Sequence, residues 1–106
     1  MGKELDLLKF ENSVRVTGSI HLPKGDRTGK SKRGVYLHFS LRHASIGYDG
    51  IERTSFLPVR VFDPGLQEWL RGKGEDVRIC LEGKLHSSTG SGKMYILAES
   101  LEDQAE

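Results

Sequence analysis

The chain has 106 residues and a formal net charge of +1, and this length corresponds to a single domain with a small core. Its one cysteine excludes an internal disulfide framework and any zinc site built on paired cysteines. No apolar run approaches the roughly 20 residues that span a bilayer. Residues 1–6 lack a secretory signal, and Asp6 stands where a myristoylation motif requires Ser or Thr. We therefore expect one soluble cytoplasmic domain over residues 1–106, without membrane contact.

The small net charge conceals an uneven distribution along the chain. Residues 1–11 sum to −1, residues 12–62 to +6 and residues 63–106 to −4. The middle segment holds nine basic residues against three acids, whereas the last segment holds five against nine. Such a division is what a one-sided basic surface produces, although an unevenly charged solvated surface produces it as well.

Alternating apolar residues between glycines predict short β-strands in the first half of the chain. We expect strands over residues 13–20, 35–42 and 54–62. A basic loop over residues 23–34, rich in Gly and Lys, separates the first two strands, and a hairpin turn over residues 46–50 joins the second and third. The period of two places these side chains toward the core: Val35, Leu37, Phe39, Leu41, Leu57, Val59 and Val61.

A single helix is predicted next, over residues 64–71. Asp63 is a good N-cap and Pro64 suits the first helical position. Leu66, Trp69 and Leu70 then form one apolar stripe. Gly72 or Gly74 is expected to end the helix. We expect Trp69 to pack the helix against the sheet.

Two more strands are predicted, over residues 76–83 and 94–100, followed by a frayed acidic tail over residues 101–106. The order of three strands, one helix and two strands matches the OB-fold, an all-β, five-stranded Greek-key barrel with the helix between its third and fourth strands. We place its core at about residues 12–102. In this fold, oligonucleotides bind the second and third strands and the loops that join strands 1–2 and 4–5.

The sequence offers no residue constellation for an enzyme, a cofactor or a metal. Gly90–Lys93 looks like the end of a phosphate-binding loop, but the motif's first glycine and its final Ser or Thr are missing. The four histidines are scattered without acidic neighbours at ligand spacing. Cys80 has no base beside it. We therefore expect a binding protein without cofactors.

Aromatic and basic residues alternate on the predicted ligand face. Flat rings stack bases without regard to sequence, and Lys and Arg contact phosphates. The predicted stacking residues are Tyr36, Tyr48, Phe56 and Phe62. The predicted phosphate contacts are Lys24, Lys30, Lys32, Arg33, Arg42, Arg60, Lys84 and Lys93. The alternatives are that some rings, above all Phe62, belong to the core, or that the exposed rings form a protein–protein interface.

Five segments in this order resemble the bacterial single-stranded DNA-binding proteins, including their small primosomal PriB-type branch. They are Asn12–Ile20, Gly34–Arg42, Leu57–Phe62, Val77–Leu85 and Lys93–Glu99. The resemblance covers roughly residues 12–102 and implies that Phe56 and Phe62 match the family's stacking aromatics. The short loop ending at Lys93 is similar to the PriB-type branch, whereas the helix is similar to the larger proteins. We expect the chain to differ from the larger proteins in lacking their acidic, aromatic-tipped tail.

The resemblance implies a homodimer that binds single-stranded DNA without sequence specificity during DNA replication or replication restart. Such a protein is associated with the nucleoid, and a replication-restart helicase or another replication protein is its candidate partner. Two alternatives stay open. One is an interaction adaptor of a replication or primosome complex with weak DNA contact. The other is an RNA-binding OB domain, because stacking is indifferent to the sugar.

Overall fold

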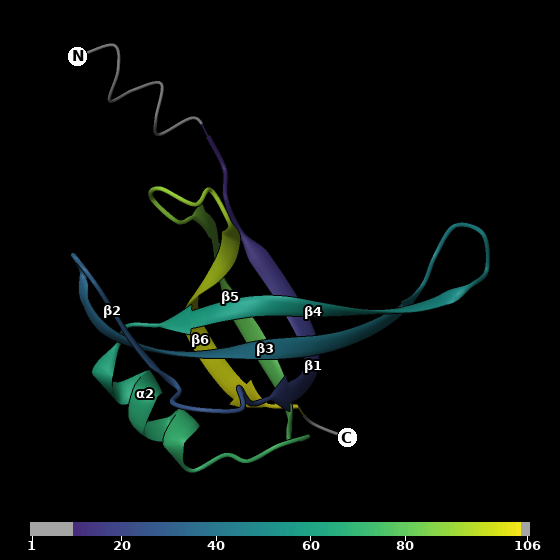
Figure 1. Ribbon diagram of the computed structural model, residues 1–106. Coiled ribbons are helices and arrows are strands. Elements are labelled where there is room, and N and C mark those ends of the chain that lie inside the picture. The colour runs from purple at the N-terminus through teal and green to yellow at the C-terminus, as the bar shows by residue number, and fades with distance from the viewer. Residues whose placement is uncertain (1–9, 105–106) are drawn as a thin grey trace.

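The structure is a computed structural model that describes residues 10–104. The expectations about targeting signals at residues 1–9 and about residues 105–106 lie outside this part of the chain. Within it, strands form a barrel and a short helix lies at one end (Figure 1). The elements are β1 (Val14–His21), β2 (Thr28–Ser31), β3 (Gly34–Ile46), β4 (Glu52–Val61), α2 (Pro64–Arg71), β5 (Arg78–Ser87) and β6 (Met94–Asp103).

One sheet closes on itself to make the barrel. Its strand order is β1-β5-β6-β4-β3-β2, and β1 also pairs with β3. β1 pairs with β5 up to Ser19 and with β3 from Ser19 onward, so one strand serves both sides of the closure. Gly18 permits this, since a Cβ there would lie 2.5 Å from the carbonyl oxygen of Arg42. Only β4 and β6 pair in parallel among the strand pairs described. This closed barrel with one short helix confirms the predicted OB-fold.

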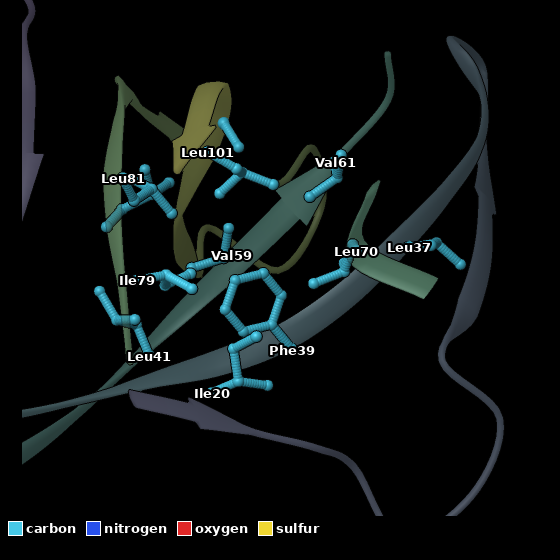
Figure 2. Close-up of a cluster of buried hydrophobic side chains, with 12 residues drawn as sticks. Ile20, Leu37, Phe39, Leu41, Val59, Val61, Leu70, Ile79, Leu81 and Leu101 are labelled. Carbon is cyan, nitrogen blue, oxygen red and sulfur yellow. The ribbon is translucent and has the colours of Figure 1, made fainter. Parts of the chain in front are cut away.

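The core lies inside the barrel and is sealed by the helix. Figure 2 shows the buried side chains, including Phe39 from β3, Val59 from β4 and Leu70 from α2. The carboxylate of Asp63 accepts a hydrogen bond from the Leu66 backbone nitrogen at 3.0 Å, which confirms the predicted N-cap. Trp69 packs against the core cluster, as expected. The helix therefore closes the barrel with the apolar stripe read from the sequence.

A buried glutamine fastens the helix to the strand ends. Gln67 is 8% exposed, and its Nε2 donates to the carbonyl oxygens of Val61 at 2.9 Å, Val35 at 3.1 Å and Phe62 at 3.2 Å. A buried amide is costly unless it is hydrogen-bonded, so these contacts offset the cost of burial. They also hold α2 against the ends of β3 and β4.

Several details differ from the sequence prediction. The strand predicted over residues 76–83 spans Arg78–Ser87. The expected loop over residues 23–34 contains β2, because the backbone of residues 28–31 pairs with β3 although these residues lack apolar alternation. The expected frayed tail instead continues β6 to Asp103, because Leu101 is buried and anchors it. Val35, predicted in the core, is 49% exposed: it lies one residue from the start of β3, at the barrel rim.

The hairpin of β3 and β4 is longer than predicted. Both strands continue past the barrel and project from it as an arm (Figure 1). We call residues 43–55 the arm. At its tip, the Gly47 backbone nitrogen donates to the carbonyl oxygen of Ile51 at 3.0 Å, the Gly50 nitrogen donates to the carbonyl oxygen of Gly47 at 2.9 Å, and Gly50 adopts a φ of 78°. The turn predicted over residues 46–50 is thus confirmed, but it lies at the end of a projecting ribbon. No helix within residues 10–104 is long and apolar enough to cross a membrane.

Candidate nucleic-acid interface

A groove of about 680 Å³ lies beside the β2–β3 hairpin, over the ends of β3 and β4 and the loop that joins β5 to β6. Its walls are basic on the hairpin side and hydroxyl-rich on the loop side. No Asp or Glu is among its lining residues. They are Lys30, Ser31, Lys32, Arg33, Tyr36, Arg60, Phe62, His86, Ser87, Ser88, Thr89, Ser91 and Tyr95. The groove therefore combines six of the twelve residues predicted from the sequence.

Arg60 occupies the centre of the groove between two aromatic rings. Its guanidinium carbon lies 4.7 Å from the ring centroid of Tyr36 and 4.2 Å from that of Tyr95. Both distances are within the range of cation–π attraction. Nη2 of Arg60 also donates to Oγ of Ser88 at 2.9 Å. β4 places Arg60 on its outward face by the predicted alternation, and β3 and β6 supply the rings on either side.

Further rings extend this stack in both directions. Phe62 lies 5.1 Å from Tyr36, centroid to centroid, and is half-buried. On the other side His86 stacks on Tyr95 at 5.8 Å with an interplanar angle of 25°. We call these five residues the ring ladder, in the order Phe62, Tyr36, Arg60, Tyr95 and His86. It places flat aromatic and guanidinium groups next to one another along the groove, and groups of this kind are the ones on which unpaired bases stack.

Tyr95 and His86 are the members of the ladder that sequence reasoning missed. Tyr95 follows the first residue of a strand predicted over residues 94–100, and sequence reasoning assigned it no role; in the structure its side chain is 7% exposed. His86 reads as one of four scattered histidines. The available signal was their position beside the loop that joins the last two strands, a region that OB-folds use for ligands.

Three lysine and arginine side chains of the β2–β3 hairpin line the groove without an ion-pair partner in the part of the chain that the structure describes: Lys30, Lys32 and Arg33. Outside the groove, Arg42 pairs with Asp76 at 2.8 Å, and it lines a separate hollow. Lys84 lies 3.6 Å from Glu99. Lys24, Arg27, Arg78 and Lys93 are also unpaired within residues 10–104. The groove is nevertheless a place where several unpaired cations line one hollow without an acidic lining residue, and unpaired cations attract a polyanion more strongly than paired ones do.

A second, smaller hollow of about 320 Å³ continues from the groove along β3 and β4. It shares Tyr36, Arg60 and Tyr95 with the groove and adds Lys93 and Pro58. This places Lys93, another predicted contact, beside the ladder. The candidate surface therefore extends from the groove along β3 and β4 toward Phe56.

Phe56 lies farther along β4 and is 53% exposed. Its ring centroid is 5.3 Å from that of His21, and Nδ1 of His21 lies 2.9 Å from the Glu75 carboxylate. A hydrogen bond from the Leu22 backbone nitrogen, followed by the His21 contact, lowers the pKa of Glu75. Phe56 therefore packs against the His21 ring, which the Glu75 carboxylate contacts. It does not line the groove.

The remaining predicted residues lie away from the ladder. Tyr48 is fully exposed at the tip of the arm. Arg53 holds that tip through the Asp49 carboxylate, and this contact is the main reason that the pKa of Asp49 is lowered. Lys24 is exposed in the segment between β1 and β2. Within residues 10–104, no group of three or more His, Cys, Asp or Glu side chains is placed to hold a metal ion.

Solved structures share this architecture across most of the chain. The small single-stranded DNA-binding protein of Streptomyces coelicolor superposes with a TM-score of 0.69 at 12% identity, over 91% of this chain and 96% of that one. The SSB of Plasmodium falciparum, in complex with ssDNA, gives a TM-score of 0.64 at 17% identity over 84% and 87%. The dimeric N-terminal domain of PriB from Thermoanaerobacter tencongensis gives 0.59 at 16% over 90% and 98%.

Sequence comparison alone does not find these relationships. No protein-family model matches the chain, and no curated protein matches it in sequence. At identities of 12–17% the structural matches establish the fold. The resemblance predicted from five short sequence segments is therefore confirmed at the level of architecture: the chain has the SSB-like form of the OB-fold.

Proposed function

We propose that this protein binds single-stranded DNA without sequence preference, with the ring ladder as the stacking surface. The observation that supports this most is Arg60 between Tyr36 and Tyr95, in a groove with unpaired cations and no acidic lining residue. Stacking contributes about 1–3 kcal/mol per base for any base, and the cations contribute through counterion release. The solved neighbours named for single-stranded DNA binding support the same function.

Single strands fit this surface better than a duplex does. The bases of a duplex are stacked on one another, so their faces are unavailable to the rings of the ladder. From Tyr36 to Arg42, β3 spans roughly 20 Å at about 3.3 Å per residue. That length, together with the groove, suits the short end of the 4–16 nucleotides that one OB-fold covers. Phe56, Arg42, Tyr48, Lys24 and Lys84 are proposed as outlying contacts.

A titration by fluorescence anisotropy tests the proposal. Labelled oligo-dT, a duplex of equal length and oligo-rU are titrated with the protein over a series of salt concentrations. If four groove cations each neutralise one phosphate, the slope of log K against log salt is about −3 for a single strand. Equal affinity for dT and duplex, or no binding at low salt, would refute the proposal. Preference for rU would favour the RNA-binding alternative.

Two triple variants distinguish the effect of the groove cations on DNA binding from the effect of net charge. Changing Lys30, Lys32 and Arg33 to Gln removes three unpaired groove cations and should flatten the slope by about 2. The control changes three basic residues outside the groove to Gln, with the same change in net charge: Arg15, Arg71 and Arg78. It should leave most of the slope intact. Equal flattening by both variants would contradict a localised site.

We also propose a biological process, a location and an oligomeric state for the protein. We infer a non-enzymatic protein of replication or replication restart, located in the cytoplasm with the nucleoid and acting as a homodimer. A dimer joins two short sites and raises their effective concentration on one strand. Light scattering on the free protein measures its mass: a monomer at micromolar concentration would contradict the dimer without affecting DNA binding. A restart helicase or another replication protein is the proposed partner.

The arm favours the interaction adaptor as a second candidate function. Its tip exposes Ile46, Tyr48 and Ile51, and its acids Asp49 and Glu52 outnumber Arg53. Exposed apolar side chains with this charge balance suit a protein partner better than a polyanion. Ile46 and Ile51 are therefore changed together to Ser. Retained DNA affinity with lost binding to a purified replication protein would favour the adaptor, whereas loss of DNA affinity would assign the arm to the DNA surface.

A further inference from the structure

A glycine lies directly beneath a ring of the ladder. In the β2–β3 pairing, Gly29 is the residue opposite Tyr36. A Cβ built on Gly29 would contact Cζ of the Tyr36 ring and lie 2.6 Å from Oη and 2.7 Å from Cε2. Real Cβ atoms do not approach other heavy atoms so closely. The Tyr36 ring therefore occupies the space that a side chain on Gly29 would need.

The ring has little freedom to move elsewhere. Arg60 lies over it, Phe62 lies 5.1 Å away, and His38 meets it edge-on at 6.3 Å. A side chain on Gly29 would push Tyr36 into these neighbours and disturb the ladder. No positive φ is involved at this glycine, unlike Gly34 at 118°. The requirement for glycine at position 29 is thus one of space and not of backbone conformation.

We propose that Gly29 is a positioning residue for nucleic-acid binding: the absence of its side chain sets where the Tyr36 ring lies, and through that ring it sets the ladder. This inference rests on the proposed function. It also connects the two halves of the site, because β2 carries the groove cation Lys30 next to Gly29, and Gly29 lies against the Tyr36 ring. A change that displaces β2 would therefore also displace the Tyr36 ring and alter the stacking surface.

Gly25 provides a matched control in the same segment. A Cβ there meets nothing within 4 Å, and its φ is not positive. Gly29→Ala and Gly25→Ala add the same methyl group and change no charge. We expect Gly29→Ala to weaken binding of oligo-dT about fivefold or more, the lower end of one lost stacking contact. The salt slope stays unchanged because every cation is retained. We expect Gly25→Ala to bind like the parent chain.

The decisive test places both changes in a Tyr36→Leu background. If Gly29 acts through the ring, Gly29→Ala has no further effect on affinity once the ring is absent. Equal loss in both backgrounds, or no loss in either, would overturn the proposal. If Gly29→Ala alone fails to fold, recovery of folding by Tyr36→Leu supports the ring contact, and failure to recover refutes it.

A measurement on the free protein separates this inference from the proposed function. Ring currents shift protons that lie over an aromatic face, so the NMR signals of the Gly29 Hα protons should lie upfield and move back in Tyr36→Leu. This readout does not require DNA. Absence of DNA binding by the parent chain would refute the proposed function while leaving the ring position measurable. An unshifted Gly29 signal in the parent chain would refute the positioning role.

Discussion

Arg60→Ala tests whether the ring ladder is a preformed part of the fold. The substitution removes two cation–π contacts and the hydrogen bond to Ser88. Each cation–π contact contributes about 1 kcal/mol at a half-buried site, and the hydrogen bond contributes about 1 kcal/mol net. The free energy of unfolding should therefore fall by about 3 kcal/mol. Arg60→Lys keeps the charge but loses the planar fork, so about half of that loss is expected.

The assay combines urea denaturation with DNA titration on the same variants. Arg60→Ala should lower the denaturation midpoint without changing the m-value, and it should flatten the salt slope by about 0.7 because one cation is lost. Arg60→Lys should keep the slope while weakening affinity. Arg78→Ala is the control: Arg78 is exposed and stacks on no ring within residues 10–104, so its effect should stay within about 0.5 kcal/mol.

A double-mutant cycle with Tyr95→Leu refines the attribution. If the guanidinium and this ring contact each other as described, the two substitutions are non-additive by about 1 kcal/mol in unfolding free energy. Additive effects, or an Arg60→Ala chain as stable as its parent, would mean that the stack does not hold the groove together. The ladder would then form only on binding, and its geometry in the free protein would not explain function.

Three further predictions concern the barrel that supports the site. Leu70→Ala should cost about 2–5 kcal/mol of stability by thermal or urea unfolding because its side chain is fully buried, whereas Leu85→Ala at 45% exposure should cost much less. Gly83→Ala should destabilise strongly, since a Cβ at the β5 bulge would collide with the Leu97 carbonyl oxygen; an unchanged midpoint would refute this. Because the pKa of Glu75 is lowered in the folded chain from 4.5, its contribution is present above that pH and lost as pH falls further. Glu75→Gln should therefore be less sensitive to acid below pH 4.5 than the parent.

The elements could be predicted because their patterns are local. Alternation over residues 35–42 and the cap, proline and apolar stripe of the helix depend on neighbours in sequence, and they place Arg60 and Phe62 on the outward face correctly. β2 could not be predicted in the same way. Its four residues, Thr28–Ser31, have no apolar pattern, and they become a strand because the exposed edge of β3 accepts their backbone hydrogen bonds.

The partners of Arg60 show where sequence reasoning ends. Tyr36 lies on β3, which pairs antiparallel with β4. A predicted hairpin of these two strands therefore already brings Tyr36 near Arg60. Tyr95 comes from β6, which pairs with β4 in parallel at Val59–Ile96, across a long connection. The register of such a pair depends on how the whole barrel closes, so no local pattern places Tyr95 against Arg60. In the structure the Tyr95 ring is 7% exposed and still lines one side of the groove.

A net charge of +1 gives a chain little overall attraction for a polyanionic ligand, but the ion pairs show that the charge is unevenly neutralised. Away from the groove, several acids form ion pairs with cations: Glu82 with Arg15, Asp76 with Arg42 and Glu99 with Lys84. The groove cations have no such partner within residues 10–104. At physiological salt the Debye length is about 8 Å, so a phosphate in the groove experiences the nearby unpaired cations far more than the distant neutralised ones. A nearly neutral chain can therefore present a strongly basic groove. Because only a few charges act there, the proposed binding of single-stranded DNA would depend on stacking as much as on electrostatics.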